Sequence, residues 1–227
     1  MIEILGKIDA DLMVFLNGFH NSYFDDVMYL TSEKWVWVPV YTAILIATIM
    51  KFGINRRMLT VVGIFTLTIV LAYTTCAAYL RPIFCRPRPS QPDSGISMLI
   101  HVVNGYRGGH YGMPSCHSAN SFALAALTMI IFKSRKLTTF IYTWAVIHTY
   151  SRIYLGVHYP GDILVGGLVG TAIAFAVCGM ARLCMGATAE SRPSPSYVIM
   201  YTGAMVFAIL LIAPAFDLRH TLIAWLG

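Results

Sequence analysis

The chain has 227 residues, of which 57% are hydrophobic and 11% are charged, and its formal net charge at pH 7 is +6. Soluble domains carry about a quarter charged residues, so this composition excludes an ordinary soluble globular protein and indicates a membrane protein. The five cysteines are too few and too scattered for a disulfide framework, and none of their spacings matches a zinc site.

Residues 1–31 are predicted to form an N-terminal amphipathic segment ahead of a membrane domain over residues 32–227. Apolar residues recur there at helical spacing, a pattern typical of a helix that lies in the membrane interface. A helix packed on the bundle fits equally well. Asn17-Gly18 is expected to end this helix, and Tyr23–Thr31 to form a second short piece. The apolar positions are Ile4, Leu5, Ile8, Leu12, Phe15, Leu16 and Phe19.

Six apolar runs follow, each about long enough to cross a hydrocarbon core of roughly 30 Å. The sequence therefore predicts an all-α integral membrane bundle of about six transmembrane helices with an N-terminal interfacial helix. The runs are Trp35–Met50, Leu59–Leu80, Ser115–Phe132, Leu137–Ile153, Gly161–Leu183 and Tyr197–Phe216.

Basic residues gather in the short loops after the first, third and fifth runs. Because such residues are held on the cytoplasmic side, both termini, residues 81–114 and residues 154–160 are expected on the outer side. The three basic loops would then face the cytoplasm. Basic loops facing anionic lipid headgroups explain the positive charge without a nucleic-acid partner. The loop residues are Lys51, Arg56, Arg57, Lys133, Arg135, Lys136, Arg182 and Arg192.

The long outer segment opens with residues 81–89, which read Arg-Pro-Ile-Phe-Cys-Arg-Pro-Arg-Pro. Arg81, Arg86 and Arg88 place three guanidinium groups at the mouth of the second run. Guanidinium groups bind phosphate or carboxylate by paired hydrogen bonds, and the prolines hold the backbone stiff. A basic anchor at the membrane surface is the competing interpretation.

Residues 114–117, Pro-Ser-Cys-His, end the outer segment. Ser115 is well placed to cap the third apolar helix, whose first N–H groups would then face outward as an anion site. His117 would stand beside that anion as a proton donor. On its own, this string most often indicates only a capped helix.

Residues 151–162 place Arg152, His158 and Asp162 between two apolar runs, where charged residues indicate function. If a helix is under way by His158, its imidazole and the Asp162 carboxylate share one face within hydrogen-bonding reach. A carboxylate on one ring nitrogen leaves the other nitrogen free to attack. A buried pair that only ties two helices together is the alternative.

All three segments fall at the outer ends of predicted helices, so we expect them to form one site. No cluster of cysteine, histidine or acidic residues resembles a metal cage, so the inferred chemistry uses no metal and no cofactor. The sequence does not decide whether Cys85 and Cys116, which lie near these segments, form a disulfide.

The set Arg81-x6-Arg88-Pro89, Pro114-Ser115-Cys116-His117 and Ser151-Arg152-x5-His158-x3-Asp162 resembles the three-part signature of the type 2 phosphatidic acid phosphatases, a superfamily that includes the vanadium haloperoxidases. The resemblance implies that His158 is the nucleophile, that Asp162 bonds its other ring nitrogen, and that His117 is the general acid and later the base. The phosphate-binding groups that it implies are Arg81, Arg88, Arg152, Ser115 and the N–H of Cys116.

The signature differs from the usual family pattern at two positions. Arg81 stands where the family usually has lysine, which keeps the charge and changes its reach. Cys116 stands where glycine is usual, and a side chain at the first position of a helix need not be costly there. We expect these changes to affect the shape of the pocket rather than the catalytic histidines.

The resemblance, together with the metal-free site, implies a metal-independent lipid phosphatase that acts through a phosphohistidine, expected in a bacterial inner membrane with its site facing the periplasm. The resemblance also implies the candidate substrates, because similar small six-span members of the family act on undecaprenyl diphosphate, lipid A phosphate, phosphatidylglycerophosphate or phosphatidic acid. His101, Arg107 and His110 could contact a second phosphate or a sugar, or be ordinary polar loop residues. A non-catalytic lipid-binding or lipid-transport protein that retains the anion site is the alternative. The hydrophobic composition argues against a soluble haloperoxidase, and the sequence indicates no oligomeric state.

Overall fold

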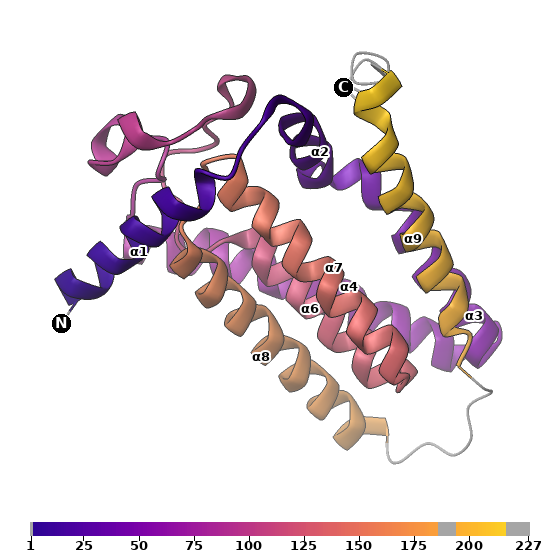
Figure 1. The fold of residues 1–227 in the computed structure, drawn as a ribbon. Helices are drawn as coiled ribbons and strands as arrows, with labels where there is room; N and C mark the ends of the chain where they lie inside the picture. The colour runs from indigo at the N-terminus through magenta and orange to yellow at the C-terminus, as the bar shows by residue number, and fades with distance from the viewer. Residues whose placement is uncertain (1, 186–193, 217–227) are drawn as a thin grey trace.

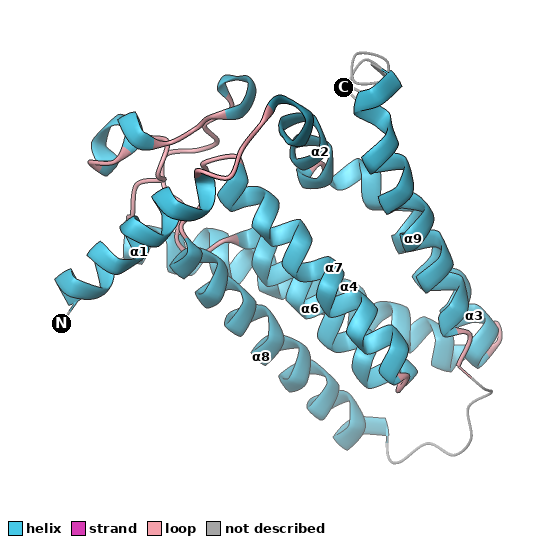
Figure 2. Ribbon diagram, in the orientation of Figure 1, coloured by secondary structure: helices cyan, strands magenta, loops and turns pink. Residues whose placement is uncertain are grey.

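The computed structural model describes residues 2–185 and 194–216, and within these ranges every named element is helical (Figure 2). The predicted all-α fold class is therefore confirmed. The longer helices are α1 (Ile2–Asn17), α2 (Ser22–Ser32), α3 (Val38–Phe52), α4 (Arg56–Thr74), α6 (Cys116–Phe132), α7 (Arg135–Tyr154), α8 (Pro160–Met185) and α9 (Ser196–Ile212).

Each of the six predicted apolar runs coincides with a helix. A 3-10 turn over Lys34–Trp37 leads into α3, and α4 continues through a π-helical turn, Thr75–Leu80, into the short helix α5 (Arg81–Phe84). Within the described chain, three helical stretches are long and apolar enough to cross a membrane: Lys34–Phe52, Arg56–Phe84 and Pro160–Ala181. Helices α6 and α9 are apolar but shorter. Six membrane crossings therefore stay a prediction.

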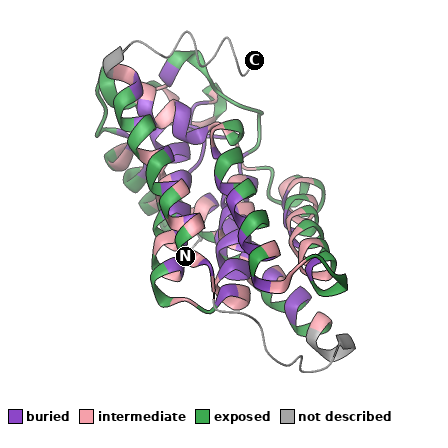
Figure 3. Cartoon of the chain, turned by 90° about the vertical axis from the view of Figure 1, so that its right-hand side faces the viewer, coloured by how far each residue is buried: buried purple, intermediate pink, exposed green. Residues whose placement is uncertain are grey.

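The helices pack into an elongated bundle (Figure 1). Helix α6 contacts α8, α7 and α4, while α3 pairs with α9. Trp37 and Trp144 meet edge to face near the middle of the core, with ring centroids 5.5 Å apart. Buried residues follow the inner sides of the helices and exposed residues their outer sides (Figure 3). The fully buried core also includes Leu137, Ile141 and Ile199.

Polar side chains cap the starts of four helices, because the first N–H groups of a helix have no partner within it. Ser115 caps α6 as predicted, and its hydroxyl accepts the N–H of Ser118. The same role falls to Asn21 at α2, Asn55 at α4 and Ser134 at α7. The side chain of Ser115 therefore fixes where α6 starts.

The N-terminal segment forms two helices, and the predicted break at Asn17-Gly18 is confirmed. The buried Asn17 amide donates to the carbonyls of Ile153 and Tyr154, at 3.1 and 2.8 Å, and so ties α1 to the end of α7. Helix α1 lies across the ends of α7 and α8 while its first turns project from the bundle (Figure 1). The exposed apolar residues of α1 are Ile4, Leu5, Ile8, Leu12 and Phe15. A position in the membrane interface stays a prediction.

Candidate active site

The second and third signature segments meet where α6 and α8 begin side by side. The N–H of Ser115 donates to the carbonyl of Asp162 at 3.0 Å. One turn further along, the Ser118 hydroxyl donates to the carbonyl of Ile163 at 2.6 Å. These two bonds fix the start of α6 against the start of α8, and they bring residues 114–117 next to residues 151–162.

The first segment joins the other two through its arginines. Arg81 Nη2 donates to the carbonyl of Pro114 at 3.3 Å and lies 3.0 Å from Cys116 Sγ. Arg88 Nη1 donates to the carbonyl of Val157 at 3.0 Å. All three segments of the signature are thus in direct contact, as the sequence predicted.

His158 and Asp162 form a hydrogen-bonded pair at the start of α8. Asp162 Oδ2 lies 3.3 Å from His158 Nδ1 and accepts the N–H of Tyr159 at 3.0 Å. Both side chains are buried, with 1% and 0% exposed. The condition considered from the sequence alone, a helix already under way by His158, is not met, because α8 begins at Pro160. The carboxylate instead reaches back from the first turn of the helix, as in one half of a capping box.

The contacts of His158 define which ring nitrogen carries the proton. Arg88 Nη1 lies 3.1 Å from His158 Nε2. Because arginine only donates, Nε2 accepts and Nδ1 carries the proton that faces Asp162. Burial, followed by the charges of Arg88, Arg152 and Arg81, holds the pKa of His158 well below its usual value. The imidazole is therefore neutral at pH 7, with its Nε2 lone pair turned toward Arg88.

Three guanidinium groups surround this histidine with unused hydrogen-bond donors. The Nε atoms of Arg81, Arg88 and Arg152 are buried and have no hydrogen-bond partner among the described residues. Burial, then Arg152 and Arg81, lowers the pKa of Arg88 to about 10, so this side chain stays charged at neutral pH. Clustered buried cations with unpaired N–H groups are suited to a bound anion with several oxygens, such as a phosphoryl group.

Arg152 is held by α2 and by the segment over residues 81–114. Its Nη1 bonds the hydroxyl of Ser32, at the end of α2, and its Nη2 donates to the hydroxyl of Tyr106 at 3.3 Å. The Tyr106 ring also lies under the guanidinium carbon, 5.5 Å from it. The long outer segment therefore helps to position a predicted phosphate-binding residue.

His117 lies in the first turn of α6, and its imidazole has no hydrogen-bond partner among the described residues. Its ring centroid lies 5.9 Å from that of His148, a residue that sequence reasoning missed. His148 bonds the Ser121 hydroxyl at 2.8 Å and stacks on Trp144 at 5.2 Å. The only signal for His148 in the sequence is a histidine inside the apolar run Leu137–Ile153.

The cysteines and the outer-segment residues have other partners. Cys85 and Cys116 are free thiols, so the disulfide that the sequence left open does not form. His101 pairs with Asp25 at 2.9 Å, and His110 pairs with Asp93 at 3.1 Å. Arg107 bonds the carbonyl of Ser90. These three residues hold the outer segment in place.

Gly112 is a second position that sequence reasoning missed. A Cβ atom at this glycine would lie 3.0 Å from Asp162 Oδ2, 3.1 Å from Arg88 Cγ and 3.4 Å from His158 Nδ1. The loop backbone can therefore cover the buried histidine and carboxylate only where no side chain intervenes. The one signal for Gly112 in the sequence is its place three residues before Ser115.

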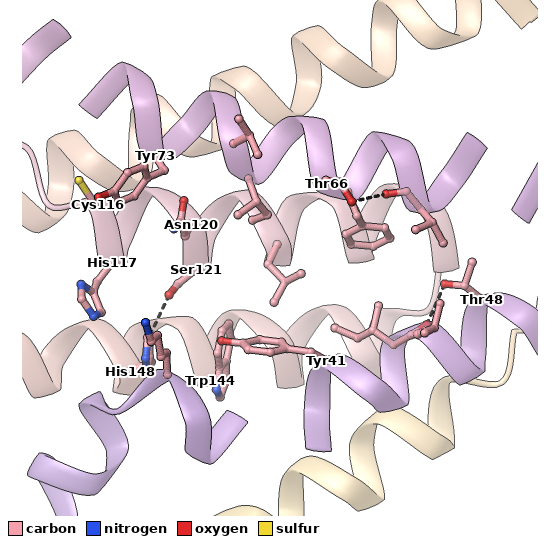
Figure 4. A pocket seen from close by; sticks show the side chains of 18 residues that line it. Tyr41, Thr48, Thr66, Tyr73, Cys116, His117, Asn120, Ser121, Trp144 and His148 are labelled. Carbon is pink, nitrogen blue, oxygen red and sulfur yellow. Dashed lines mark hydrogen bonds between the residues drawn. The ribbon is translucent and has the colours of Figure 1, made fainter. Parts of the chain in front are cut away.

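A largely apolar cavity of about 720 Å³ leads away from the site between α3, α4, α6 and α7. Cys116, His117 and Asn120 lie at its polar end, and Tyr41 and Thr48 lie further along it (Figure 4). His158 and Arg88 are not among its lining residues. The cavity therefore meets the site at the start of α6, beside the residue expected to act as the general acid.

Comparison with known proteins gives a consistent result. Over residues 61–186, more than half of its length, the chain matches the PAP2 superfamily. It is 38% identical over 220 residues to a lipid A 4'-phosphatase from Bacteroides thetaiotaomicron. The alignment covers 93% of this chain and 97% of that protein. It is 30% identical over 184 residues to an undecaprenyl-diphosphatase from Sulfolobus acidocaldarius. That alignment covers 77% of this chain and 75% of the other protein.

A solved structure gives the same answer for the fold. A transmembrane PAP2-type phosphatidylglycerolphosphate phosphatase from Bacillus subtilis superposes with a TM-score of 0.56 at 18% identity, over 82% of this chain and 89% of that one. At this identity the likeness concerns the fold alone. The matched range 61–186 contains all three segments that meet around His158. The chain therefore belongs to the PAP2 superfamily, as the resemblance of its signature implied.

Proposed function

We propose that this protein removes a phosphate group from a membrane lipid through a phosphohistidine intermediate on His158. One observation carries the proposal: the neutral, buried Nε2 of His158 faces Arg88 at 3.1 Å, while Asp162 holds the opposite ring nitrogen. This arrangement presents a nucleophile to an anion-binding cluster.

In the first step, the lone pair of His158 Nε2 attacks phosphorus, and the bond from phosphorus to the lipid oxygen breaks. His117 gives its proton to the departing oxygen, so a lipid phosphomonoester leaves as an alcohol and a lipid diphosphate leaves as the monophosphate. The imidazole of His158 becomes positively charged in this step, and the carboxylate of Asp162 stabilises that charge through Nδ1.

In the second step, a water molecule attacks the phosphorus of the phosphohistidine. His117, now neutral, takes the proton of that water, and the bond between phosphorus and Nε2 breaks. Inorganic phosphate leaves, and His158 returns to its neutral form. One histidine therefore serves as acid and then as base at the same position.

The arginines supply the electrostatic part of the mechanism. Phosphoryl transfer shifts charge among the equatorial oxygens of phosphorus, and donors fixed in place stabilise that charge without reorganising. In this proposal Arg81, Arg88 and Arg152 bind those oxygens with their unpaired N–H groups, joined by the N–H groups at the start of α6. No step requires a metal ion.

The cavity supports a lipid as the substrate, because it offers an apolar channel beside His117 where the leaving group would lie. We propose a phosphate of lipid A as the first candidate, since the lipid A 4'-phosphatase relative aligns over 93% of this chain. Undecaprenyl diphosphate is the second candidate, on the weaker match to an undecaprenyl-diphosphatase.

The chain is a membrane protein, and we propose that all six core helices cross the inner membrane with the site on the periplasmic side. The basic loops between α3 and α4 and between α6 and α7 lie at the end of the bundle away from the site (Figure 1). Retention of these loops in the cytoplasm would place the signature residues outside.

The test is phosphate release by the detergent-purified protein in EDTA. The panel contains lipid A, undecaprenyl diphosphate, phosphatidylglycerophosphate and phosphatidic acid, with His158→Ala as the matched control. We expect lipid A to be the preferred substrate and the control to release no phosphate. Activity that EDTA abolishes and Mg²⁺ restores would refute the metal-free mechanism. No release from any lipid would favour the non-catalytic alternative.

A further inference from the structure

We propose that Asp9 and Arg86 are positioning residues for the pair His158–Asp162, so that the N-terminal helix α1 forms part of the active site. This inference rests on the proposed function, because it assigns the two residues a role in the reaction of His158. Neither residue belongs to the signature, and sequence reasoning grouped Arg86 with the other arginines at the mouth of the second helix.

Arg86 links two carboxylates through a single nitrogen atom. Its Nη1 lies 2.6 Å from Asp9 Oδ2 and 3.2 Å from Asp162 Oδ1. The other oxygen of Asp162 faces His158 Nδ1. A continuous chain of charged groups therefore runs from α1 to the nucleophilic histidine, with Arg86 as its second member.

The guanidinium of Arg86 is fixed in this position. It stacks over the ring of Tyr159, with its central carbon 3.6 Å from the ring centroid. The backbone carbonyl of Arg86 accepts the N–H of Gly112 at 2.9 Å. Because Asp162 is fully buried and Arg86 is only 23% exposed, the contact between them is shielded from water and strengthened.

Asp9 is also held at both of its oxygens. Oδ2 contacts Arg86, while Oδ1 accepts the N–H of Gly161 in the first turn of α8 at 2.8 Å. A Cβ atom at Gly161 would lie 2.6 Å from Asp9 Oδ2, so a side chain at this position would displace the Asp9 carboxylate. Asp9 thus docks α1 on the same turn of α8 that carries Asp162.

The effect on the reaction follows from the balance of charge. Without Asp9, the full charge of Arg86 would act on Asp162 and weaken its hold on the imidazole proton. Asp9 offsets that charge, which leaves Asp162 free to stabilise the cationic phosphohistidine. The other charged or titratable groups close to His158 are the arginines Arg81, Arg88 and Arg152, and His117. Asp9 therefore adds negative charge where cations predominate.

The test compares Asp9→Asn with the wild type in the phosphate-release assay. Asparagine keeps an oxygen for the N–H of Gly161 but removes the charge. We expect kcat to fall about tenfold to hundredfold with little change in KM, a range typical of residues that orient a catalytic group through a second side chain. Loss of a negative charge also lowers the pKa of His158, so the acid limb of the pH–rate profile should move to lower pH.

Asp11→Asn is the matched control, because Asp11 is an exposed carboxylate on the same helix. We expect this variant to retain the wild-type kcat and pH profile. A second comparison places Asp9→Asn in an Arg86→Met background. If Asp9 acts through Arg86, its substitution should then change kcat by less than about twofold, since residues in one network are not additive.

Each outcome bears on the inference separately from the proposed function. A wild-type protein without phosphatase activity refutes the function itself. An active wild type together with a fully active Asp9→Asn variant overturns the positioning role. A lowered Tm with unchanged kcat and pH profile also overturns it, because Asp9 would then only anchor α1.

Discussion

The guanidinium of Arg81 lies 3.0 Å from the thiol of Cys116, and these are the two positions at which the chain departs from the usual signature of its family. The same guanidinium nitrogen also contacts the carbonyl of Pro114. The sulfur atom therefore helps to hold the longer arginine side chain against the start of α6. The two departures form one local unit, which the sequence could not reveal.

This contact predicts that the two positions depend on each other. Arg81→Lys alone should lower kcat/KM, because the thiol of Cys116 loses its contact with the guanidinium group. Cys116→Gly alone should also lower it, because Arg81 loses a partner. The double variant should be more active than the product of the single effects predicts, by a factor of about 3 to 10, as is typical of residues in contact.

The measurement is a double-mutant cycle on kcat/KM with the preferred lipid. Cys85→Gly provides the control, because this exposed cysteine bonds the carbonyl of Pro82 and not an arginine of the site. Additive effects of Arg81→Lys and Cys116→Gly would show that the contact does not contribute to kcat/KM.

A second prediction concerns Asp162→Asn. An amide can donate its own proton to His158 Nδ1, which stabilises the tautomer with the proton on Nε2 and removes the nucleophilic lone pair. We expect kcat to fall on the order of 10³-fold or more, as for other histidines that lose an orienting carboxylate. Asp93→Asn is the control, because Asp93 pairs with His110 in a half-exposed contact of the outer segment. Comparable activity in the two variants would contradict the role of Asp162.

A third prediction links stability to pH through His158. Burial, with Arg88, Arg152 and Arg81, holds the pKa of its imidazole well below the usual value in the folded protein. In the unfolded chain the pKa returns to about 6.5, so at lower pH the unfolded state binds a proton that the folded state does not. Stability from this residue is therefore complete above about pH 6.5 and declines below it, by up to about 1.4 kcal/mol per pH unit.

Thermal unfolding between pH 7 and pH 5 measures this contribution. We expect Tm of the wild type to fall on acidification, and Tm of His158→Asn to fall less steeply. His110→Asn, which removes a half-exposed histidine of the outer segment, should keep the wild-type slope. Parallel slopes for the wild type and His158→Asn would mean that burial of the imidazole does not contribute to acid sensitivity.

The parts of the molecule that could be predicted from the sequence are those specified by short-range patterns. Hydrophobic runs indicated six helices at their observed positions, and Ser115 indicated the start of α6. The spacing from His158 to Asp162 indicated their contact, although the carboxylate achieves it from the first turn of α8. The superfamily and the class of enzyme, a phosphatase, were also predicted, and the curated relatives bear this out.

The parts that could not be predicted depend on packing between distant residues. Arg86 stands two residues before Arg88 in the same proline-rich string, yet it faces Asp162 and Asp9 instead of the cluster around His158. Its partner Asp9 lies far away in the sequence, on a helix whose amphipathic pattern left two positions open, the membrane interface or the side of the bundle. His148 was hidden for a similar reason, since its partner Ser121 belongs to another helix.

The last prediction concerns the cavity between α3, α4, α6 and α7. If it holds the lipid part of the substrate, Ile69→Trp should obstruct it, because Ile69 is a partly buried lining residue on α4. We expect KM for a long-chain lipid phosphate to rise about tenfold or more, as loss of apolar burial equal to two methylene groups would give. Hydrolysis of a water-soluble aryl phosphate should be unchanged. Leu67→Trp is the matched control, since Leu67 is 48% exposed on the same helix and does not line the cavity. An equal loss of activity toward both substrates would show that Ile69→Trp distorts the catalytic residues, and an unchanged KM would show that the lipid lies elsewhere.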